Sequence, residues 1–466
     1  MTPSALPTSG RPAVVVDIGK TRLKLSVVEA DGTLRHAAAA DNRPYLSGPY
    51  PAHDVERTWA WLLDALSDPR VRDAGSIVVA THGATAACLG AEWLALPILD
   101  YEWDGVREFD ADYDRLRPPF AESGSPALPA GLNLGRQLHW LERRHADAFA
   151  ACRHILMFPQ YWAWRLSGGL ASEATSLGCH TDLWAPHAGG FSSLVAARDW
   201  GGRLPPLRPA WEPAGRLLPP LAARTGLGGD VRVLTGIHDS NASLLPYLQN
   251  GSVGTMVSTG TWIVVMALSG AGAPLRQSLD MLVNVDAAGR PVPCIRFMGG
   301  RELAVLAAGT DPGSATADEA LALARQGVMA LPGFTESGGP FLGSRGRVLG
   351  DPGAGNPAAL GMLYCALMTD LCLDLLGAPG PIAIDGGFSR MPLFADLLAA
   401  LRPQERVLRV SDARPGAAWL AAWPDGPGPA PAQVPATGLT RDPAAAALLA
   451  AYRQAWRAAL PPLPGG

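Results

Sequence analysis

The feature that most constrains this chain is a strand–turn–strand pattern that occurs in two places far apart in the sequence. Residues 14–28 (VVVDIGKTRLKLSVV) run from an apolar strand through a small polar turn into a second strand. Residues 254–268 (GTMVSTGTWIVVMAL) follow the same pattern, with one glycine and a threonine in the turn. The two stretches are not copies, but together they predict two domains that begin alike. A chain of 466 residues is long enough for two domains.

Strands and helices alternate along the rest of the chain, which predicts an α/β protein. The first third adds an Asp-Gly hairpin turn at 31–32, a third strand at 33–40, a helix at 55–66 and a strand at 76–83. Further on we expect two helices within 133–166, a strand followed by a helix at 231–245, and a strand–turn–helix unit at 381–401. We also expect helices at 356–377 (capped and buried), at 413–423 and from Asp442-Pro443 onward, and a Pro/Gly-rich linker at 424–438.

Composition excludes several classes of function. The net charge of −4 gives no basic field for nucleic acid, so we expect no nucleic-acid partner. The six cysteines include no C-x-x-C pair and the nine histidines no H-E-x-x-H motif, which argues against a redox, zinc or other transition-metal site. No stretch of about 18 uninterrupted apolar residues and no signal peptide is visible, so we expect a cytoplasmic protein without a membrane partner.

The first turn, Asp17-x-Gly19-x-Thr21, has the residue types of a phosphate-binding loop. Glycine allows backbone N–H groups to approach phosphate oxygens, and the threonine hydroxyl adds a donor. A carboxylate beside a triphosphate would be repelled unless it faces magnesium, directly or through water. The same pattern also occurs in ordinary hairpins, so this motif alone decides nothing. Lys20 stands out within it because Lys24 is the only other lysine in the chain.

Two later turns could contact a nucleotide. The residues Ser258, Thr259, Gly260 and Thr261 could form a second phosphate turn, and Gly386-Gly387 follows the apolar strand that ends at Asp385. A glycine pair at the end of a strand permits close approach by a flat nucleotide ring or its ribose. The structural alternative is a plain turn in each case.

Asp239 lies mid-chain in the sequence GIHDSNA, at the end of a buried strand and before an expected helix. A lone aspartate there is most often a helix N-cap. The functional alternative is a general base that accepts the proton of a hydroxyl group as that group attacks phosphorus.

The order and spacing of these motifs resemble the two-domain sugar kinases of the actin and hexokinase superfamily. Within that group the chain, from about residue 14 to 423, is similar to the FGGY carbohydrate kinases. The segments that carry the resemblance are VATHGATAACL, FPQYWAWRLSG, SEATSLGCHTDLW, GIHDSNA, VSTGTW and IDGGFSRMPLFADLLA.

The resemblance implies a fold of two ribonuclease H-like α/β domains facing across a cleft. It implies an N-terminal domain at 1–245 that binds the sugar and carries the first phosphate motif, and a C-terminal domain at 246–466 that binds the nucleotide. The expected substrates are ATP and a small sugar, with Mg²⁺ as cofactor, and the protein is expected to be a monomer or homodimer.

The resemblance also implies roles for individual residues. Asp239 is the expected catalytic base, and Asp17 and Asp239 are expected to face magnesium through water. The expected sugar-binding residues are Thr81, His82, Gly83, Asp100, Glu102, His238 and Ser240. The expected ATP- and phosphate-binding residues are Gly19, Lys20, Thr21, Ser258, Thr259, Gly260, Thr261, Gly386 and Gly387.

Two departures from the family pattern concern the substrate. Lys20 stands where the family usually has a second small hydroxyl residue, and it could reach a phosphate or point into solvent. LDYEWDG at 99–105 replaces the more common Trp-x-Asp-x-Arg, so an arginine often near substrate is missing. The combination of DIGKT, HGAT and GIHDSNAS favours a 6-deoxy-ketohexose such as L-rhamnulose or L-fuculose, with Trp103, Tyr161 and Trp262 as possible apolar walls for its methyl group.

Three alternatives remain open at this point. The substrate could be a pentulose or glycerol. The protein could be a sugar-sensing or transport-coupling protein with a kinase fold and little catalysis. A chaperone-like or cytoskeletal ATPase of the same superfamily is disfavoured, because long charged insertions are absent and GIHDSNA is present.

Overall fold

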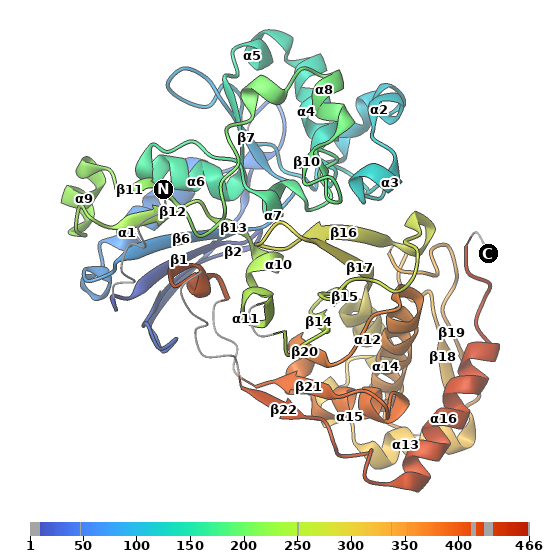
Figure 1. Cartoon of the computed structure of the whole chain (residues 1–466). Coiled ribbons are helices and arrows are strands. Elements are labelled where there is room, and N and C mark those ends of the chain that lie inside the picture. The colour runs from blue at the N-terminus through green and yellow to red at the C-terminus, as the bar shows by residue number, and fades with distance from the viewer. Residues whose placement is uncertain are drawn as a thin grey trace. The chain divides into compact units, whose positions relative to one another are not determined.

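The structure is a computed structural model that describes residues 10–46, 48–248, 251–336, 338–351, 353, 355–411, 416–423 and 432–464 (Figure 1). The chain forms two compact units. The first unit contains Met1–Asn250, Val283–Pro291 and Arg414–Ala430, and the second contains Gly251–Leu282, Val292–Ala413 and Pro431–Gly466. The predicted division of roles between residues 1–245 and 246–466 stays a prediction.

The first unit is built on a mixed sheet with the strand order β11-β12-β6-β1-β2-β3, in which β13 also pairs with β6. The predicted opening hairpin is confirmed, since β1 (Ala13–Ile18) and β2 (Arg22–Val28) are antiparallel neighbours and β3 (Leu34–Asp41) follows β2. The predicted buried strand β6 (Ser76–Thr81) pairs in parallel with β1, so both strands end at the same edge. This edge therefore brings the first turn close to the residues that follow Thr81.

Alternate residues of these strands cover the two faces of the sheet. On one face, Val14 and Val16 pack with residues of α1 (Val55–Leu66) and α6 (Phe158–Ser167). On the other face, Val15 and Val78 pack with Trp419 and Leu420. The helix expected at 413–423 is a 3-10 helix at Gly416–Ala421, and residues 412–415 lie outside the described residues.

A further core of the first unit packs α4 (Leu134–Arg144) against the antiparallel pair β7 (Ala86–Leu89) and β8 (His154–Met157). The predicted helices within 133–166 are thus α4 and α6, with a short helix and a strand between them. The remaining elements of this unit are β4 (Pro44–Tyr45), β5 (Ala52–His53), α2 (Asp110–Leu116), α3 (Phe120–Ser123), α5 (Ala146–Ala150), α7 (Ala174–Leu177), β9 (Trp184–Ala185), β10 (Gly190–Phe191), α8 (Ser193–Ala197), β11 (Pro213–Arg216), α9 (Pro219–Thr225), β12 (Arg232–Leu234), β13 (Ile237–His238), α10 (Asp239–Ala242) and α11 (Leu245–Leu248).

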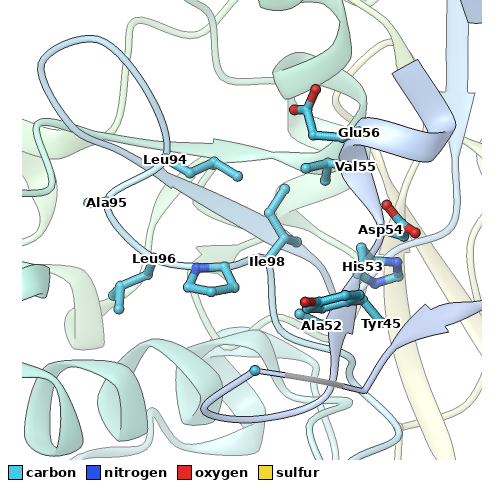
Figure 2. A pocket seen from close by; sticks show the side chains of 12 residues that line it. Tyr45, Ala52, His53, Asp54, Val55, Glu56, Leu94, Ala95, Leu96 and Ile98 are labelled. Carbon is cyan, nitrogen blue, oxygen red and sulfur yellow. The ribbon is translucent and has the colours of Figure 1, made fainter. Parts of the chain in front are cut away.

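A pocket of about 440 Å³ opens in the first unit beside β5 (Figure 2). Its walls are mainly apolar and include Leu94, Leu96 and Ile98, and His53 forms part of the lining. The His53 ring also stacks on the ring of His82, with 5.1 Å between the centroids. The predicted sugar-binding residues do not line this pocket, although His82 contacts His53 of its lining.

The second unit contains a sheet with the order β16-β17-β15-β14-β20-β21-β22. The predicted second hairpin is confirmed as β14 (Thr255–Thr259) and β15 (Ile263–Ala267), and β20 (Ile382–Gly386) runs parallel to β14. The other strands and helices are β16 (Met281–Val285), β17 (Pro291–Phe297), α12 (Gly299–Ala307), α13 (Ala317–Gln326), β18 (Met329–Leu331), β19 (Arg347–Leu349), α15 (Pro392–Leu401), β21 (Val407–Val410), β22 (Gln433–Pro435) and α16 (Pro443–Ala458).

The buried helix expected at 356–377 is α14 (Pro357–Leu376). Asn356 Oδ1 accepts a hydrogen bond from Ala358 N at 3.0 Å, and Gly377 ends the helix in the left-handed conformation with φ +60°. Within the described ranges, α14 is the helix whose length and hydropathy would suit a membrane span, but 89% of its apolar window is buried inside the protein. The helix therefore forms the core of the second unit.

The last part of the described chain contains an edge strand and a terminal helix. Asp442 Oδ1 caps α16 by accepting from Ala444 N and Ala445 N, which confirms the predicted last helix. Part of the expected linker at 424–438 is instead the edge strand β22, and residues 424–431 lie outside the described residues. The proline in β22 is compatible with this position, because an edge strand has one side without ladder partners.

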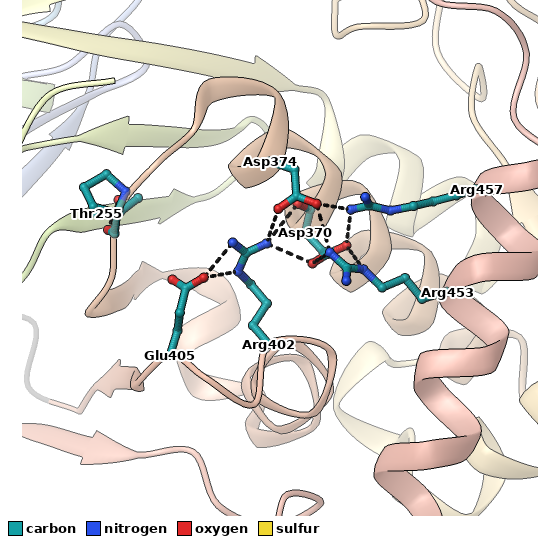
Figure 3. Close-up of polar contacts among 8 residues, drawn as sticks. Thr255, Asp370, Asp374, Arg402, Glu405, Arg453 and Arg457 are labelled. Carbon is teal, nitrogen blue, oxygen red and sulfur yellow. Dashed lines mark hydrogen bonds and ion pairs between the residues drawn. The ribbon is translucent and has the colours of Figure 1, made fainter. Parts of the chain in front are cut away.

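A cluster of charges joins three helical segments of the second unit (Figure 3). The Asp370 carboxylate on α14 is completely buried and accepts from Arg402 at 3.0 Å, Arg453 at 2.6 Å and Arg457 at 2.6 Å. Asp374, one turn further along α14, contacts the same three arginines but is one-third exposed. The cluster ties α14 to α16 and to the residue that follows α15.

Candidate active site

The first predicted phosphate turn connects β1 and β2. Asp17 lies opposite Lys24 in the hairpin, and Lys24 Nζ donates to Asp17 Oδ2 at 3.1 Å. Asn42 Nδ2 donates to the Gly19 carbonyl oxygen at 2.8 Å, which fixes the far side of the turn. Thr21 is exposed, so its hydroxyl is accessible to a ligand.

Asp239 is the first residue of α10 and follows β13 directly, while His238 is the N-cap residue. The N-cap alternative for Asp239 therefore does not describe its position. Asp239 Oδ1 accepts from the backbone N of Ser240 at 2.6 Å and from its hydroxyl at 3.3 Å. Since β13 pairs in parallel with β6, the Asp239 carboxylate lies at the same sheet edge as the first turn.

Asp17 and Asp239 are close enough for the charge of Asp239 to affect the pKa of Asp17. Burial raises the pKa of Asp17, Lys24 opposes the rise, and the negative charge of Asp239 adds to it. The pKa of Asp239 is also raised, chiefly by burial, while His82, Ser240 and Lys24 oppose the rise. Two carboxylates that repel each other in this way suit a shared cation.

His82 and His238 surround Asp239 as neutral rings. Burial lowers the pKa of each imidazole to about 4. The Asn241 side-chain amide donates to His238 Nδ1 at 3.4 Å, so the neutral ring carries its proton on Nε2, 3.6 Å from Asp239 Oδ1. His82 Nδ1 lies 3.0 Å from the Gly83 carbonyl oxygen and must donate to it, which leaves Nε2 as a buried acceptor.

Two other predicted sugar residues have clear structural roles. Thr81 is fully buried, and its hydroxyl donates to the His82 carbonyl oxygen at 2.9 Å, so that hydroxyl serves the backbone. Gly83 packs against His238, because a Cβ atom on Gly83 would lie 2.6 Å from His238 Nε2. Gly83 is therefore needed to make room for the His238 ring.

The structure places Lys20 with two predicted sugar residues. Lys20 Nζ forms an ion pair with Asp100 Oδ1 and lies 3.5 Å from Glu102 Oε2. The ammonium also lies over the Tyr101 ring, 4.7 Å from its centroid, and that ring meets His82 edge-on. Of the two directions expected for Lys20, phosphate or solvent, neither describes these contacts.

Glu173 was not singled out from the sequence, although it lies in the quoted segment SEATSLGCHTDLW. Its carboxylate is buried and accepts from Thr175 N, Thr175 Oγ1, Ser176 N and Ser176 Oγ. Thr175 Oγ1 in turn accepts from the backbone N of His238 at 3.1 Å. Glu173 thus supports the backbone just before Asp239. No local pattern marks it, because glutamate is not among the residues preferred at a helix N-cap.

In the second unit, the turn between β14 and β15 combines exposed and buried groups. Gly260 and Thr261 are exposed, whereas Thr259 is buried. The Thr259 hydroxyl donates to the Asp385 carbonyl oxygen and accepts from Phe388 N at 3.0 Å, so it joins β14 to the glycine turn after β20. The Gly260 N–H donates to the Trp262 carbonyl oxygen at 2.8 Å, so the accessible donors of this turn are at Thr261, with Ser258 partly exposed beside it.

The glycines of the predicted nucleotide and phosphate turns differ in the room that the fold leaves for a side chain. Gly386 has φ +90°, and a Cβ atom there would lie 2.0 Å from the Thr259 carbonyl oxygen, so the fold itself requires glycine. A Cβ on Gly387 or Gly260 would meet no atom closer than 3.8 Å or 4.0 Å respectively. Glycine at these two positions is thus not explained by packing within the unit, which is consistent with space kept for a ligand.

Magnesium needs a different kind of site from the transition metals. Among the described residues, no group of three or more His, Cys, Asp or Glu side chains could hold a metal ion. Mg²⁺ is commonly held by one or two carboxylates together with substrate phosphates and water. The Asp17 and Asp239 carboxylates fit this mode of binding.

Comparison with known proteins identifies the family. The model of the FGGY N-terminal domain matches residues 128–246, and that of the carbohydrate kinase FGGY C-terminal domain matches residues 252–431. A solved carbohydrate kinase from Novosphingobium aromaticivorans is 37% identical with a TM-score of 0.88, over 97% of this chain and 98% of that one. The chain belongs to the FGGY family of carbohydrate kinases.

Two more distant relatives extend this result. Xylulose kinase from Rhodospirillum rubrum is 20% identical with a TM-score of 0.74, over 96% of this chain and 98% of that one, which shows the fold alone. The L-fuculokinase of Haemophilus influenzae is 24% identical over 277 residues, or 55% of this chain and 57% of that protein. The FGGY chain thus matches little more than half the length of that curated relative.

These comparisons confirm the predicted class and fold. The protein is an FGGY carbohydrate kinase with the predicted pair of α/β domains of the actin and hexokinase type, and its family uses ATP.

Proposed function

We propose that this FGGY kinase transfers the γ-phosphoryl group of ATP to a primary hydroxyl of a ketose, with Asp239 as general base. The observation that carries the proposal is the placement of Asp239 at the end of β13, next to β6 and within electrostatic reach of Asp17. This arrangement leaves one carboxylate to receive a proton and a second to hold a cation.

In the proposed reaction, the hydroxyl oxygen of the sugar forms a bond to the γ-phosphorus. The bond between that phosphorus and the β–γ bridging oxygen breaks, ADP leaves, and the hydroxyl proton passes to Asp239. The phosphoryl transition state is loose, so the proton leaves late and a carboxylate is a sufficient base. His238 Nε2, 3.6 Å from Asp239 Oδ1, orients the carboxylate without neutralising it.

Mg²⁺, when bound, would neutralise the developing charge on the phosphate oxygens. Asp17 would hold it, with Lys24 Nζ at 3.1 Å fixing the other face of the Asp17 carboxylate. The exposed Thr261 would supply backbone and hydroxyl donors suited to phosphate oxygens, and Gly260 beside it leaves room for their approach. Gly387, where a side chain would meet no close atom, suits approach by the nucleoside.

We further propose that the sugar is a 6-deoxy-ketohexose such as L-rhamnulose or L-fuculose. The similarity to the L-fuculokinase of Haemophilus influenzae and the motifs DIGKT, HGAT and GIHDSNAS support this choice. Tyr101, whose ring contacts both His82 and Lys20, offers an apolar surface beside the predicted sugar residues. A pentulose or glycerol is the competing substrate class.

The test is an ADP-release screen with ATP and magnesium over L-rhamnulose, L-fuculose, L-ribulose, D-xylulose, L-xylulose and glycerol. We expect the highest kcat/KM with a 6-deoxy-ketohexose. Asp239→Asn should retain the fold and ATP affinity and lose about 10²–10⁴-fold in turnover. Parent-like turnover in this variant would exclude Asp239 as the base, and binding of a sugar by the parent without ADP release would instead favour a sensing protein.

A further inference from the structure

The side chain of Lys20 extends from the first turn to the loop at 99–105. Its ammonium is paired with Asp100 and lies 3.5 Å from Glu102, although 80 residues separate Lys20 from Asp100 in the sequence. Only 15% of the Lys20 side chain and 6% of the Asp100 side chain are exposed. A pair so well shielded from solvent fixes the position of both groups far better than a surface ion pair would.

The acidic residues Asp100 and Glu102 of the loop at 99–105 are paired with Lys20, whereas Asp104 lies 3.8 Å from Arg107. The sequence LDYEWDG contains Asp100, Glu102 and Asp104 but no lysine or arginine. Asp100 Oδ1 accepts from both Lys20 Nζ and the backbone N of Glu102, the latter at 3.0 Å. The cation therefore arrives from the hairpin between β1 and β2, and it holds this loop in place.

The ammonium of Lys20 lies among predicted sugar residues and their aromatic neighbours. The ammonium lies over Tyr101, and its positive charge contributes to lowering the pKa of His82 and His53. Asp239 acts on Tyr101 as well, since its negative charge contributes to raising the pKa of the Tyr101 hydroxyl. Lys20, Tyr101, His82 and Asp239 thus border one region of the first unit.

We propose that Lys20 is a specificity-determining residue for the sugar rather than a phosphate ligand, an inference that rests on the proposed kinase function. An ammonium has three N–H donors. Asp100 takes one and Glu102 lies close enough to take a second, so one donor is left for a sugar hydroxyl. That hydroxyl can donate its own proton to a free carboxylate oxygen of the same pair.

The local charge sets the substrate class. Two carboxylates face one ammonium here, so the loop keeps a net negative charge even with Lys20 in place. A neutral polyol gains hydrogen bonds at such a site, whereas the carboxylate of a sugar acid meets repulsion. The site therefore selects a neutral ketose and rejects an aldonic acid such as D-gluconate.

The experiment compares Lys20→Met with Arg22→Met. Both substitutions remove one positive charge at similar side-chain length, but Arg22 is 59% exposed and its nearest carboxylate, Asp41, lies 3.9 Å away. We expect Lys20→Met to raise the KM for the sugar about 10–100-fold, the value of one or two charged hydrogen bonds. The Kd for ATP, measured by calorimetry, should stay within about twofold of the parent value. Arg22→Met should match the parent in both.

Loss of Lys20 leaves Asp100 buried without its partner, so the double variant Lys20→Met with Asp100→Asn provides a neutral replacement. It should fold and show the same rise in the KM for the sugar. A weaker Kd for ATP with an unchanged KM for the sugar would overturn the inference in favour of a phosphate contact. Efficient phosphorylation of D-gluconate by the parent would overturn the charge argument.

These results separate from those of the kinase proposal. If the parent phosphorylates a ketose and Lys20→Met has the same KM for it, the role of Lys20 fails while the kinase function stands. If the parent binds a ketose without turnover, calorimetry on the same variants measures the Kd for that ketose. A Kd raised about 10–100-fold in Lys20→Met supports the role of Lys20, and an unchanged Kd overturns it. If the parent neither binds nor phosphorylates any sugar of the screen, both proposals fail together.

Discussion

The Nε2 atom of His238 lies 3.6 Å from Oδ1 of Asp239, and both residues stand where β13 gives way to α10. Because burial lowers the pKa of His238 to about 4, the ring is neutral near pH 7 and acts on the carboxylate as a dipole. The position of this ring depends on Gly83, whose missing side chain leaves the room that Nε2 occupies.

Gly83→Ala should therefore lower kcat and also cost about 1–3 kcal/mol of stability, because it overpacks a buried site. The added Cβ would lie 2.6 Å from His238 Nε2 and 2.8 Å from Cδ2, so the ring must move and release the Asp239 carboxylate from its orientation. Misplacement of about 1 Å can cost up to about 10²-fold in rate. Steady-state kinetics check this, with Gly202→Ala as control because a Cβ there meets nothing within 4 Å. Parent-like kcat in Gly83→Ala would contradict the role of the ring.

Gly260→Val should weaken ATP binding without unfolding the protein. The nearest atom to a Cβ at Gly260 is the Trp262 carbonyl oxygen at 4.0 Å, so the second unit can accept a side chain. A β-branched side chain would instead occupy the space proposed for phosphate. We expect calorimetry to show at least about a tenfold loss of ATP affinity, which is about 1.4 kcal/mol of binding free energy. The melting temperature without ATP should be unchanged. Unchanged ATP affinity would exclude the phosphate role of this turn.

Gly386→Ala should instead lower the stability of the protein even without ATP. Here φ is +90° and the Cβ would lie 2.0 Å from the Thr259 carbonyl oxygen, so the substitution strains the backbone whatever is bound. Strain at such a position costs about 1–3 kcal/mol before the steric clash is added. Thermal or urea unfolding without ATP measures the effect. A stability equal to that of the parent would show that the strand pair relaxes more easily than this geometry implies.

Glu173 should make stability depend on pH. Burial raises its pKa to about 7, although Thr175 and Ser176 oppose the rise through hydrogen bonds. The folded state therefore holds a proton that the unfolded chain releases at lower pH, and this contribution to stability is full below the ordinary glutamate pKa. It is lost as the pH rises through about 7, at about 1.4 kcal/mol for each pKa unit of difference.

Urea unfolding at pH 4.5, 6 and 8 measures this dependence, and Glu173→Gln provides the reference. Glutamine cannot accept all four hydrogen bonds that Glu173 accepts, so the variant should be less stable at every pH. It should also lack the fall in stability between pH 4.5 and 8 that Glu173 causes. The same pH slope in the variant would show that another group is responsible.

Asp370→Asn should destabilise the second unit severely. The substitution leaves Arg402, Arg453 and Arg457 around a buried neutral amide, with Asp374 as the carboxylate that they still share (Figure 3). Breaking a buried ion pair from one side costs up to about 3–5 kcal/mol. The matched control is Asp112→Asn, where Asp112 pairs with the largely exposed Arg115, and about 0–1 kcal/mol is expected. Equal melting temperatures for the two variants would contradict the proposed role of the cluster.

Much of the architecture was predictable because it depends on local pattern. The helix expected at 55–66 is α1. As predicted, Asn356 and Asp442 cap the beginnings of α14 and α16, and Gly377 ends α14. The predictions failed where tertiary contacts decide the local state. Residues 416–421 form a 3-10 helix against the sheet of the first unit, and the expected linker contains β22, which pairs with β21.

The sequence by itself determined the family, the strands and turns that carry the motifs, and the order of those motifs, because spacing and apolar period are properties of the chain alone. Only the tertiary structure decided what each residue faces. It places Lys20 on Asp100, 80 residues away, and distinguishes glycines required by packing, Gly83 and Gly386, from Gly260, which leaves open space. The physical reason is that ion pairs, burial and steric room arise between segments that only folding brings together.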